Sequence, residues 1–203
     1  MTGTDTSLFY IHDPMCSWCW GFRPTWDALK RALPTSIHVI NLTGGLAPDS
    51  DQVMPIAMQQ TIEDYWHTIQ QQLGTEFNFD FWRKNQPRRS TYIACRAAIA
   101  ADNQGAQDTM IDAIQQAYYL RALNPSDRSV LLQLAAELEL QTETFTRDLE
   151  SPVTHAEFKR QRALAHSLPI QGFPSLVLKR GEQLAGITLN YLDVKPMLDA
   201  IAA

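Results

Sequence analysis

The most informative stretch of this 203-residue sequence is Leu8-Phe9-Tyr10-Ile11-His12-Asp13-Pro14-Met15-Cys16-Ser17-Trp18-Cys19-Trp20-Gly21. The apolar and aromatic run over 8–12 predicts a buried strand, and the Asp-Pro pair that follows ends it. From Trp20 onward, apolar side chains recur at helical spacing as far as Leu33, and Pro34 ends this predicted helix. The two cysteines therefore stand where a strand passes into a helix.

This position favours thiol chemistry. Unpaired N–H groups and the helix dipole stabilise an anion at a helix N-terminus, so we expect Cys16 to form a thiolate readily. Cys19 lies one helical turn further on, where its sulfur can reach that of Cys16 and release a mixed disulfide. Half of a zinc site and two unrelated buried cysteines are the alternatives. Zinc is disfavoured because structural zinc needs four ligands, and the sequence has no second Cys-x-x-Cys and no paired histidines.

Strand signals recur on both sides of a long helical region. The segment 37–42 predicts a second strand, which Gly44-Gly45 ends because glycine readily takes a positive φ. The order strand, helix, strand predicts a parallel βαβ unit. Late in the chain, the segments 175–178 and 183–187 predict a hairpin, and 192–202 a closing helix.

The middle of the chain, from Asp49 to about Leu168, carries almost no strand signal. A wide apolar stripe predicts one long helix over 53–73. Shorter helices are expected over 92–101, 110–123, 130–140, 145–149 and 155–166.

Composition excludes several classes of function. Lys and Arg number 17 against 22 Asp and Glu, a net charge of −5, which is a poor match for nucleic acid or an anionic membrane. No stretch approaches the roughly 20 apolar residues of a membrane span. The segment 1–7 lacks the features of a secretory signal, so we expect a cytoplasmic protein. Three cysteines do not make a disulfide scaffold.

The cysteine segment resembles a known family. Asp-Pro-Met-Cys-Ser-Trp-Cys-Trp-Gly, over 13–21, is similar to the active-site segment of the DsbA-like thioredoxin superfamily, and most of all to its cytoplasmic FrnE-like branch. Gly44-Gly45-Leu46, the helical segment 90–97 and Gly172-Phe173-Pro174-Ser175 fit that branch as well. The resemblance extends from about Leu8 to Ile201.

The resemblance implies an α/β protein with a thioredoxin-like fold and a large all-helical insertion. Residues 1–48 and 168–203 would form the discontinuous thioredoxin-like domain, and residues 49–167 the inserted helical domain. The activity implied is that of a thiol–disulfide oxidoreductase, related to disulfide isomerases, with no cofactor beyond its redox-active disulfide. Its partners would be protein or peptide thiols and disulfides, with glutathione as a possible co-substrate, and no metal is implied.

The resemblance also assigns roles to residues. Cys16 would be the attacking, surface cysteine and Cys19 the buried resolving one. Pro174 would follow a cis peptide bond beside the disulfide, and the backbone of Phe173 would pair with an extended substrate. Trp18 could present apolar surface to that substrate. We expect the Phe173 side chain to face the sulfur atoms.

The residues around this motif have plainer interpretations. His12 is expected to be a core histidine with satisfied hydrogen bonds, and Asp13 an Asx-turn residue rather than a proton relay. Cys95 lies in an Ala-rich segment and is expected to be a small buried side chain. Arg88-Arg89 is expected to be a solvated pair at the start of a helix, and of Trp18 and Trp20 at least one should be core.

Two other functions remain open. Kappa-class glutathione transferases and 2-hydroxychromene-2-carboxylate isomerases share the implied architecture, but commonly carry Ser at the position of Cys16. A peptide-binding or chaperone-like module would use the apolar groove without the cysteines. The motif itself departs from DsbA, which carries Pro-His where this chain has Ser17-Trp18, so the direction of electron flow cannot be transferred.

Overall fold

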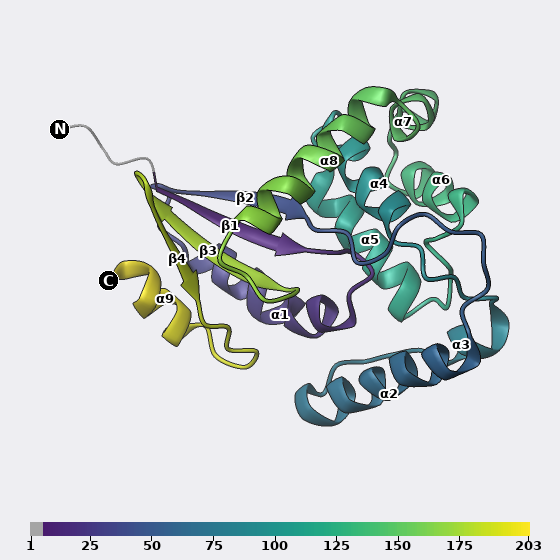
Figure 1. Ribbon diagram of the computed structural model, residues 1–203, viewed down its shortest axis with the longest axis horizontal. Coiled ribbons are helices and arrows are strands. Elements are labelled where there is room, and N and C mark those ends of the chain that lie inside the picture. The colour runs from purple at the N-terminus through teal and green to yellow at the C-terminus, as the bar shows by residue number, and fades with distance from the viewer. Residues whose placement is uncertain (1–5) are drawn as a thin grey trace.

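The computed structural model describes residues 6–203. Segment 1–5, which includes most of the stretch judged to lack a secretory signal, lies outside the described residues. The elements run in the order β1 (Thr6–His12), α1 (Ser17–Ala32), β2 (Ile37–Thr43), α2 (Ile56–Leu73), α3 (Asp80–Lys84), α4 (Tyr92–Asp102), α5 (Gln107–Tyr119), α6 (Arg128–Glu137), α7 (Thr142–Leu149), α8 (Pro152–Ser167), β3 (Ser175–Arg180), β4 (Gln183–Ile187) and α9 (Lys195–Ala202) (Figure 1).

The four strands form one mixed sheet in the order β2-β1-β3-β4. β1 and β2 are parallel, with Leu8 opposite Val39, which confirms the predicted βαβ unit. β3 runs antiparallel to β1 and pairs with β4 as a hairpin, also as predicted. The α/β fold with a helical insertion is therefore confirmed.

Both faces of this sheet are covered, because successive side chains of a strand point to opposite sides. Leu8 and Tyr10 of β1 point toward α1 and α9, where they pack in a cluster with Trp26 and Met197. The alternate side chains of β1 pack instead with the end of α8 and the residue after it, through Ala165 and Leu168. The strand β1 is thus buried on both sides, which explains its continuous apolar run.

Figure 1 shows helices α4 to α7 gathered beyond the ends of β1 and β2, at the side of the molecule opposite α9. The largest apolar cluster lies among these helices and α2, around the fully buried Trp66 and Tyr119. Because α8 also packs on the sheet, it connects the two regions, and the domain limits at 48/49 and 167/168 remain predictions. Among residues 6–203, no helix combines the length and apolar character that crossing a membrane requires.

Several helix bounds differ from prediction: α5 covers Gln107–Tyr119 rather than 110–123, and α6 ends at Glu137 rather than 140. α2 begins at Ile56 rather than 53, and only Trp66 and Ile69 within it are fully buried, so the N-terminal half of the predicted stripe is largely exposed. α9 begins at Lys195 rather than 192, because the Asn190 side chain accepts hydrogen bonds from the next backbone N–H groups and holds a turn. The short helix α3, which carries Phe81 and Trp82, was not predicted.

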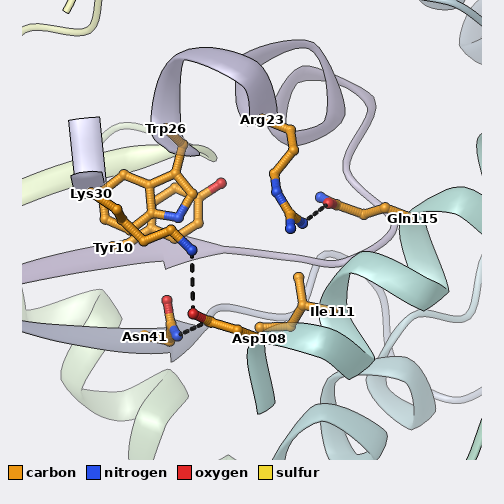
Figure 2. Close-up of a pocket in the computed structure, with 8 residues that line it drawn as sticks. All are labelled: Tyr10, Arg23, Trp26, Lys30, Asn41, Asp108, Ile111 and Gln115. Atoms are coloured by element: carbon orange, nitrogen blue, oxygen red, sulfur yellow. Dashed lines mark hydrogen bonds and ion pairs between the residues drawn. The ribbon is translucent and has the colours of Figure 1, made fainter. Parts of the chain in front are cut away.

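Polar side chains join the helical region to the sheet. They surround a cavity of only about 10 Å³ between α1, β2 and α5 (Figure 2). Lys30 and Asn41 both bind Asp108 of α5, at 3.2 and 2.9 Å, and Arg23 donates to Gln115 at 2.8 Å. These contacts hold the insertion against the helix that carries the two cysteines.

Candidate functional site

The turn from β1 into α1 positions both cysteines. Cys16 is the N-cap of α1, and its backbone N–H donates to the carbonyl oxygen of Asp13 at 3.0 Å. Cys19 lies one turn further along the helix and is completely buried. Only 6% of the surface of Cys16 is exposed, so the expectation of a surface cysteine is wrong. Cys16 lines a cavity.

The loop before β3 comes to the same place. β3 pairs with β1 so that Ser175 lies opposite Ile11, which brings the preceding loop to the end of β1 where the cysteines begin. The peptide bond between Phe173 and Pro174 is cis. The Cys16 Sγ lies 3.5 Å from the carbonyl oxygen of Phe173, to which the thiol can donate.

The ring of Phe173 does not make this contact. A Cβ atom built on Gly44 would lie 1.9 Å from Cζ of the ring, so the ring tip rests on the backbone of Gly44. The group of Phe173 within hydrogen-bond distance of the attacking sulfur is its carbonyl, and the expectation that the side chain faces the sulfur atoms stays a prediction. Of the two glycines after β2, Gly45 supplies the positive φ, at 70°, and Gly44 supplies the space.

A cavity of about 180 Å³ opens beside Cys16. Trp18 lines it, as expected for a residue that contacts substrate, and its ring packs edge-on against Tyr191. Trp18 and Trp20 are both half-buried and pack against the largest apolar cluster. The complete lining comprises Met15, Cys16, Ser17, Trp18, Leu46, Ile62, Tyr65, Arg89 and Phe173.

Four of these residues had no signal as site residues in the sequence. Leu46, Ile62, Tyr65 and Arg89 come from the segment after β2, from α2 and from the segment before α4, and only the packing brings them together. The expectation of a solvated Arg88-Arg89 pair is wrong. The guanidinium of Arg88 binds Asp127 and the carbonyl of Ser126, whereas Arg89 faces the cavity.

Burial raises the pKa of the Cys19 thiol well above its usual value, and the hydrogen bond with Cys16 and the charge there raise it further. Cys19 is therefore protonated at neutral pH. An uncharged thiol behind the attacking sulfur suits a group that acts second.

Asp13 connects three segments beneath the cysteines. One carboxylate oxygen accepts from the N–H of Met15 at 2.7 Å, which is the expected Asx turn. The other accepts from the N–H of Leu46 and the hydroxyl of Thr91, both at 2.7 Å. Burial raises the pKa of Asp13, and these hydrogen bonds partly oppose that effect. Its carboxylate is thus engaged in holding the fold together.

Cys95 lies on the far side of Asp13. It is completely buried, packs with Ile99 and Phe158, and its Sγ lies 3.5 Å from the Asp13 carboxylate. Burial, together with the Asp13 charge, raises the pKa of Cys95 well above its usual value. The expectation of a small buried side chain is confirmed, with the added contact to Asp13.

His12 is buried as expected, but its hydrogen bonds are not satisfied. Both ring nitrogens lack a partner among residues 6–203, and the ring stacks on Tyr10 at 4.7 Å. Burial lowers the pKa of His12 to about 3. Within the same residues, no group of three or more His, Cys, Asp or Glu side chains is arranged to hold a metal ion.

These features define a thioredoxin-like fold with a Cys-x-x-Cys motif at the start of its first helix and a Pro loop beside it. A family model described as thioredoxin matches residues 9–197, nearly the whole chain. The protein belongs to the thioredoxin family. Its structural neighbours include DsbA-like oxidoreductases.

Two solved structures illustrate the similarity. A candidate protein disulfide isomerase from Nitrosomonas europaea is 25% identical, with a TM-score of 0.85 over 98% of this chain and 96% of the other. The cytosolic disulfide reductase DsbM from Pseudomonas aeruginosa is 27% identical, with a TM-score of 0.75 over 97% and 93% of the two chains. DsbM has also been solved with GSH.

A curated relative, the ClpXP adapter protein SpxH of Bacillus subtilis, is 24% identical over 174 residues. The match covers 83% of this chain and 56% of SpxH, so the chain spans little more than half of that relative's length.

Proposed function

We propose that this protein exchanges a Cys16–Cys19 dithiol/disulfide with small thiols, glutathione among them, and with protein or peptide thiols. One observation carries the proposal. The Cys16 sulfur stands at the N-terminus of α1, beside the Phe173 carbonyl and a cavity, while Cys19 is buried one turn behind it.

In this mechanism the Cys16 thiolate attacks one sulfur of a partner disulfide and releases the other partner sulfur as a thiolate, which takes up a proton. Cys19 then loses its proton and attacks Sγ of Cys16, which releases the second partner thiol and closes the protein disulfide. Two electrons pass from the protein to the partner. The reverse sequence reduces the protein disulfide, and the geometry supports both directions.

Glutathione and the cytoplasm enter this proposal through the relatives. The similar DsbM is described as a cytosolic disulfide reductase and has been solved with GSH. We therefore place the activity in the cytoplasm, where glutathione keeps thiols reduced. The proposed reaction uses no cofactor besides the redox-active cysteines.

The experiment that tests this proposal is trapping of the mixed disulfide. Reduced Cys19→Ser protein should accumulate one glutathione adduct on Cys16, read by mass spectrometry after reaction with oxidised glutathione. Cys16→Ser should neither form the adduct nor turn over. Cys95→Ala is the matched control and should keep its activity, because Cys95 is buried and held protonated.

If Cys16→Ser retained full function, the cysteine chemistry would be incidental. A non-catalytic peptide-binding role would then lead, and one observation favours it as second candidate. Ile56, Met58 and Tyr65 of α2 expose 73, 40 and 48% of their surface on the element that lines the Cys16 cavity. Chemistry of the kappa-class glutathione transferase or 2-hydroxychromene-2-carboxylate isomerase type is less well supported, because those proteins commonly carry Ser at the position of Cys16 and this chain has both cysteines.

A further inference from the structure

Arg89 is the charged residue of the Cys16 cavity. The remaining residues that line it are apolar or carry uncharged polar groups, apart from the thiol itself. No hydrogen bond or ion pair joins the Arg89 side chain to any other residue within 6–203. Its charge acts on the phenol of Tyr118, but burial raises the pKa of that phenol, so this neighbour stays neutral. The guanidinium is thus half-buried and without a counter-charge.

The backbone that carries Arg89 is held firmly on both sides. Before it, Arg88 forms a β-bridge with Val53 and an ion pair with Asp127. After it, the hydroxyl of Ser126 donates a hydrogen bond to the carbonyl oxygen of Ser90, and the hydroxyl of Thr91 donates one to the Asp13 carboxylate. A cation on a fixed backbone, without a partner of its own, is suited to bind an anion from outside.

The second feature of the cavity is its size. At about 180 Å³ it is smaller than the roughly 300–1,000 Å³ of pockets that enclose a whole drug-sized ligand. It fits one residue-sized part of a ligand, with the sulfur at Cys16 and a charged group at Arg89. The N-terminus of α1 at the same place adds its positive dipole end.

We infer that Arg89 binds the carboxylate of a small thiol or disulfide while its sulfur reacts with Cys16, and so selects carboxylate-bearing substrates such as oxidised glutathione over neutral ones. This inference rests on the proposed function, because it requires attack by Cys16. Arg89 makes no bond to the reacting sulfur, so it determines specificity and leaves the exchange step to the two cysteines. The protein has a net charge of −5, so the local cation supplies an attraction that the molecule as a whole does not.

The test compares two disulfides on the reduced protein: oxidised glutathione, which carries carboxylates, and hydroxyethyl disulfide, which carries no charge. Arg89→Gln should lower the second-order rate constant for oxidised glutathione about tenfold, the effect of losing about 1.4 kcal/mol of a charge-assisted hydrogen bond. The rate constant for hydroxyethyl disulfide should change less than about twofold. The readout is tryptophan fluorescence, because Trp18 and Trp20 flank Cys19.

The ratio of the two rate constants separates recognition from any effect of Arg89 on Cys16 itself, which acts on both disulfides alike. Arg89→Lys should recover part of the ratio. Arg83→Gln removes an exposed arginine that pairs with Asp80 and does not line the cavity, and it should leave the ratio unchanged. Added salt should reduce the wild-type preference for oxidised glutathione, since it screens the attraction.

The outcomes distinguish the two proposals. If wild-type protein reacts with neither disulfide, the proposed function is wrong. If wild-type protein reacts with both, but Arg89→Gln slows both equally or slows neither, carboxylate recognition by Arg89 is wrong and the oxidoreductase function stands. Unchanged thermal melting of each variant shows that the fold is intact.

Discussion

Two neighbouring buried residues at the end of β1, His12 and Asp13, differ in whether their side chains are hydrogen-bonded. Asp13 accepts hydrogen bonds from three separate segments, so its buried carboxylate is compensated. The imidazole nitrogens of His12 have no hydrogen-bond partner among the residues the structure describes, and the ring avoids the cost of a buried charge by staying neutral. The residue next to the active-site turn is therefore sensitive to acid.

We expect this sensitivity in the stability of the protein. Folded His12 stays neutral down to about pH 3, whereas in the unfolded chain it takes up a proton below about pH 6.5. The unfolded state then binds more protons, so stability falls as the pH drops from 6.5 toward 3, by up to about 1.4 kcal/mol per pH unit. His12→Leu should lose this part of the pH dependence, measured by urea denaturation at pH 7.5 and pH 5.

The control for this prediction is His155→Gln, which changes an exposed histidine on α8 and should keep the wild-type pH profile. Parallel pH profiles for wild type and His12→Leu would show that His12 does not contribute to acid sensitivity.

At the scale of elements, the site depends on two loops that touch. The segment after β2 and the loop before β3 meet where the ring of Phe173 rests on Gly44. The backbone N–H of Gly44 in turn donates to the carbonyl of His12 at 2.7 Å, which ties this segment to the end of β1. The position of the Phe173 carbonyl beside Cys16 thus depends on the absence of a side chain at residue 44.

Gly44→Ala should therefore destabilise the protein by about 1–3 kcal/mol, the usual cost of overpacking, and lower its exchange activity as the Phe173 loop is displaced. Phe173→Ala removes the ring, so the double variant Gly44→Ala with Phe173→Ala should lose much less than the sum of the single effects. The measurement is a double-mutant cycle by urea denaturation.

Gly172→Ala is the matched control, because a Cβ at residue 172 meets nothing within 4 Å. It should leave stability and activity near those of the wild type. Simple additivity of the Gly44 and Phe173 substitutions would contradict the contact on which this prediction rests.

At the scale of the whole molecule, hydrogen bonds and ion pairs hold helix α5 of the insertion to α1 and β2. Arg23 on α1 binds Asp112 and Gln115 of α5, and it is 17% exposed, while Gln115 is almost fully buried. Lys30 binds Asp108, of which 57% is exposed. The two contacts therefore differ in how much water competes for them.

The difference predicts an order of effects. Arg23→Leu should cost about 1–3 kcal/mol of stability, because it leaves the buried Gln115 without its partner. Lys30→Met should cost less than about 1 kcal/mol, since water and salt screen its ion pair. Both are measured by urea denaturation at neutral pH. A larger loss of stability in Lys30→Met than in Arg23→Leu would show that the attachment of the insertion depends mainly on the exposed Lys30–Asp108 pair.

Much of this organisation could be predicted from the sequence, because it is local. The run over 8–12 predicted β1 and the recurring apolar residues predicted α1, so the Cys-x-x-Cys segment was correctly placed between strand and helix. The parallel βαβ unit and the β3–β4 hairpin followed from short-range patterns of apolar residues and turns. Boundaries were less exact where a single side chain, such as that of Asn190, holds a turn.

The surroundings of Cys16 depend instead on contacts between distant parts of the chain. The Arg88-Arg89 pair carries no pattern that separates a structural arginine from one that faces a cavity. The ring of Phe173 turns to Gly44, 129 positions earlier, because only the glycine leaves room there. The local chemistry of two cysteines at a helix start was therefore determined by the sequence, whereas the tertiary packing decided which groups surround the attacking sulfur, since those groups come together only when the sheet and the insertion close on one another.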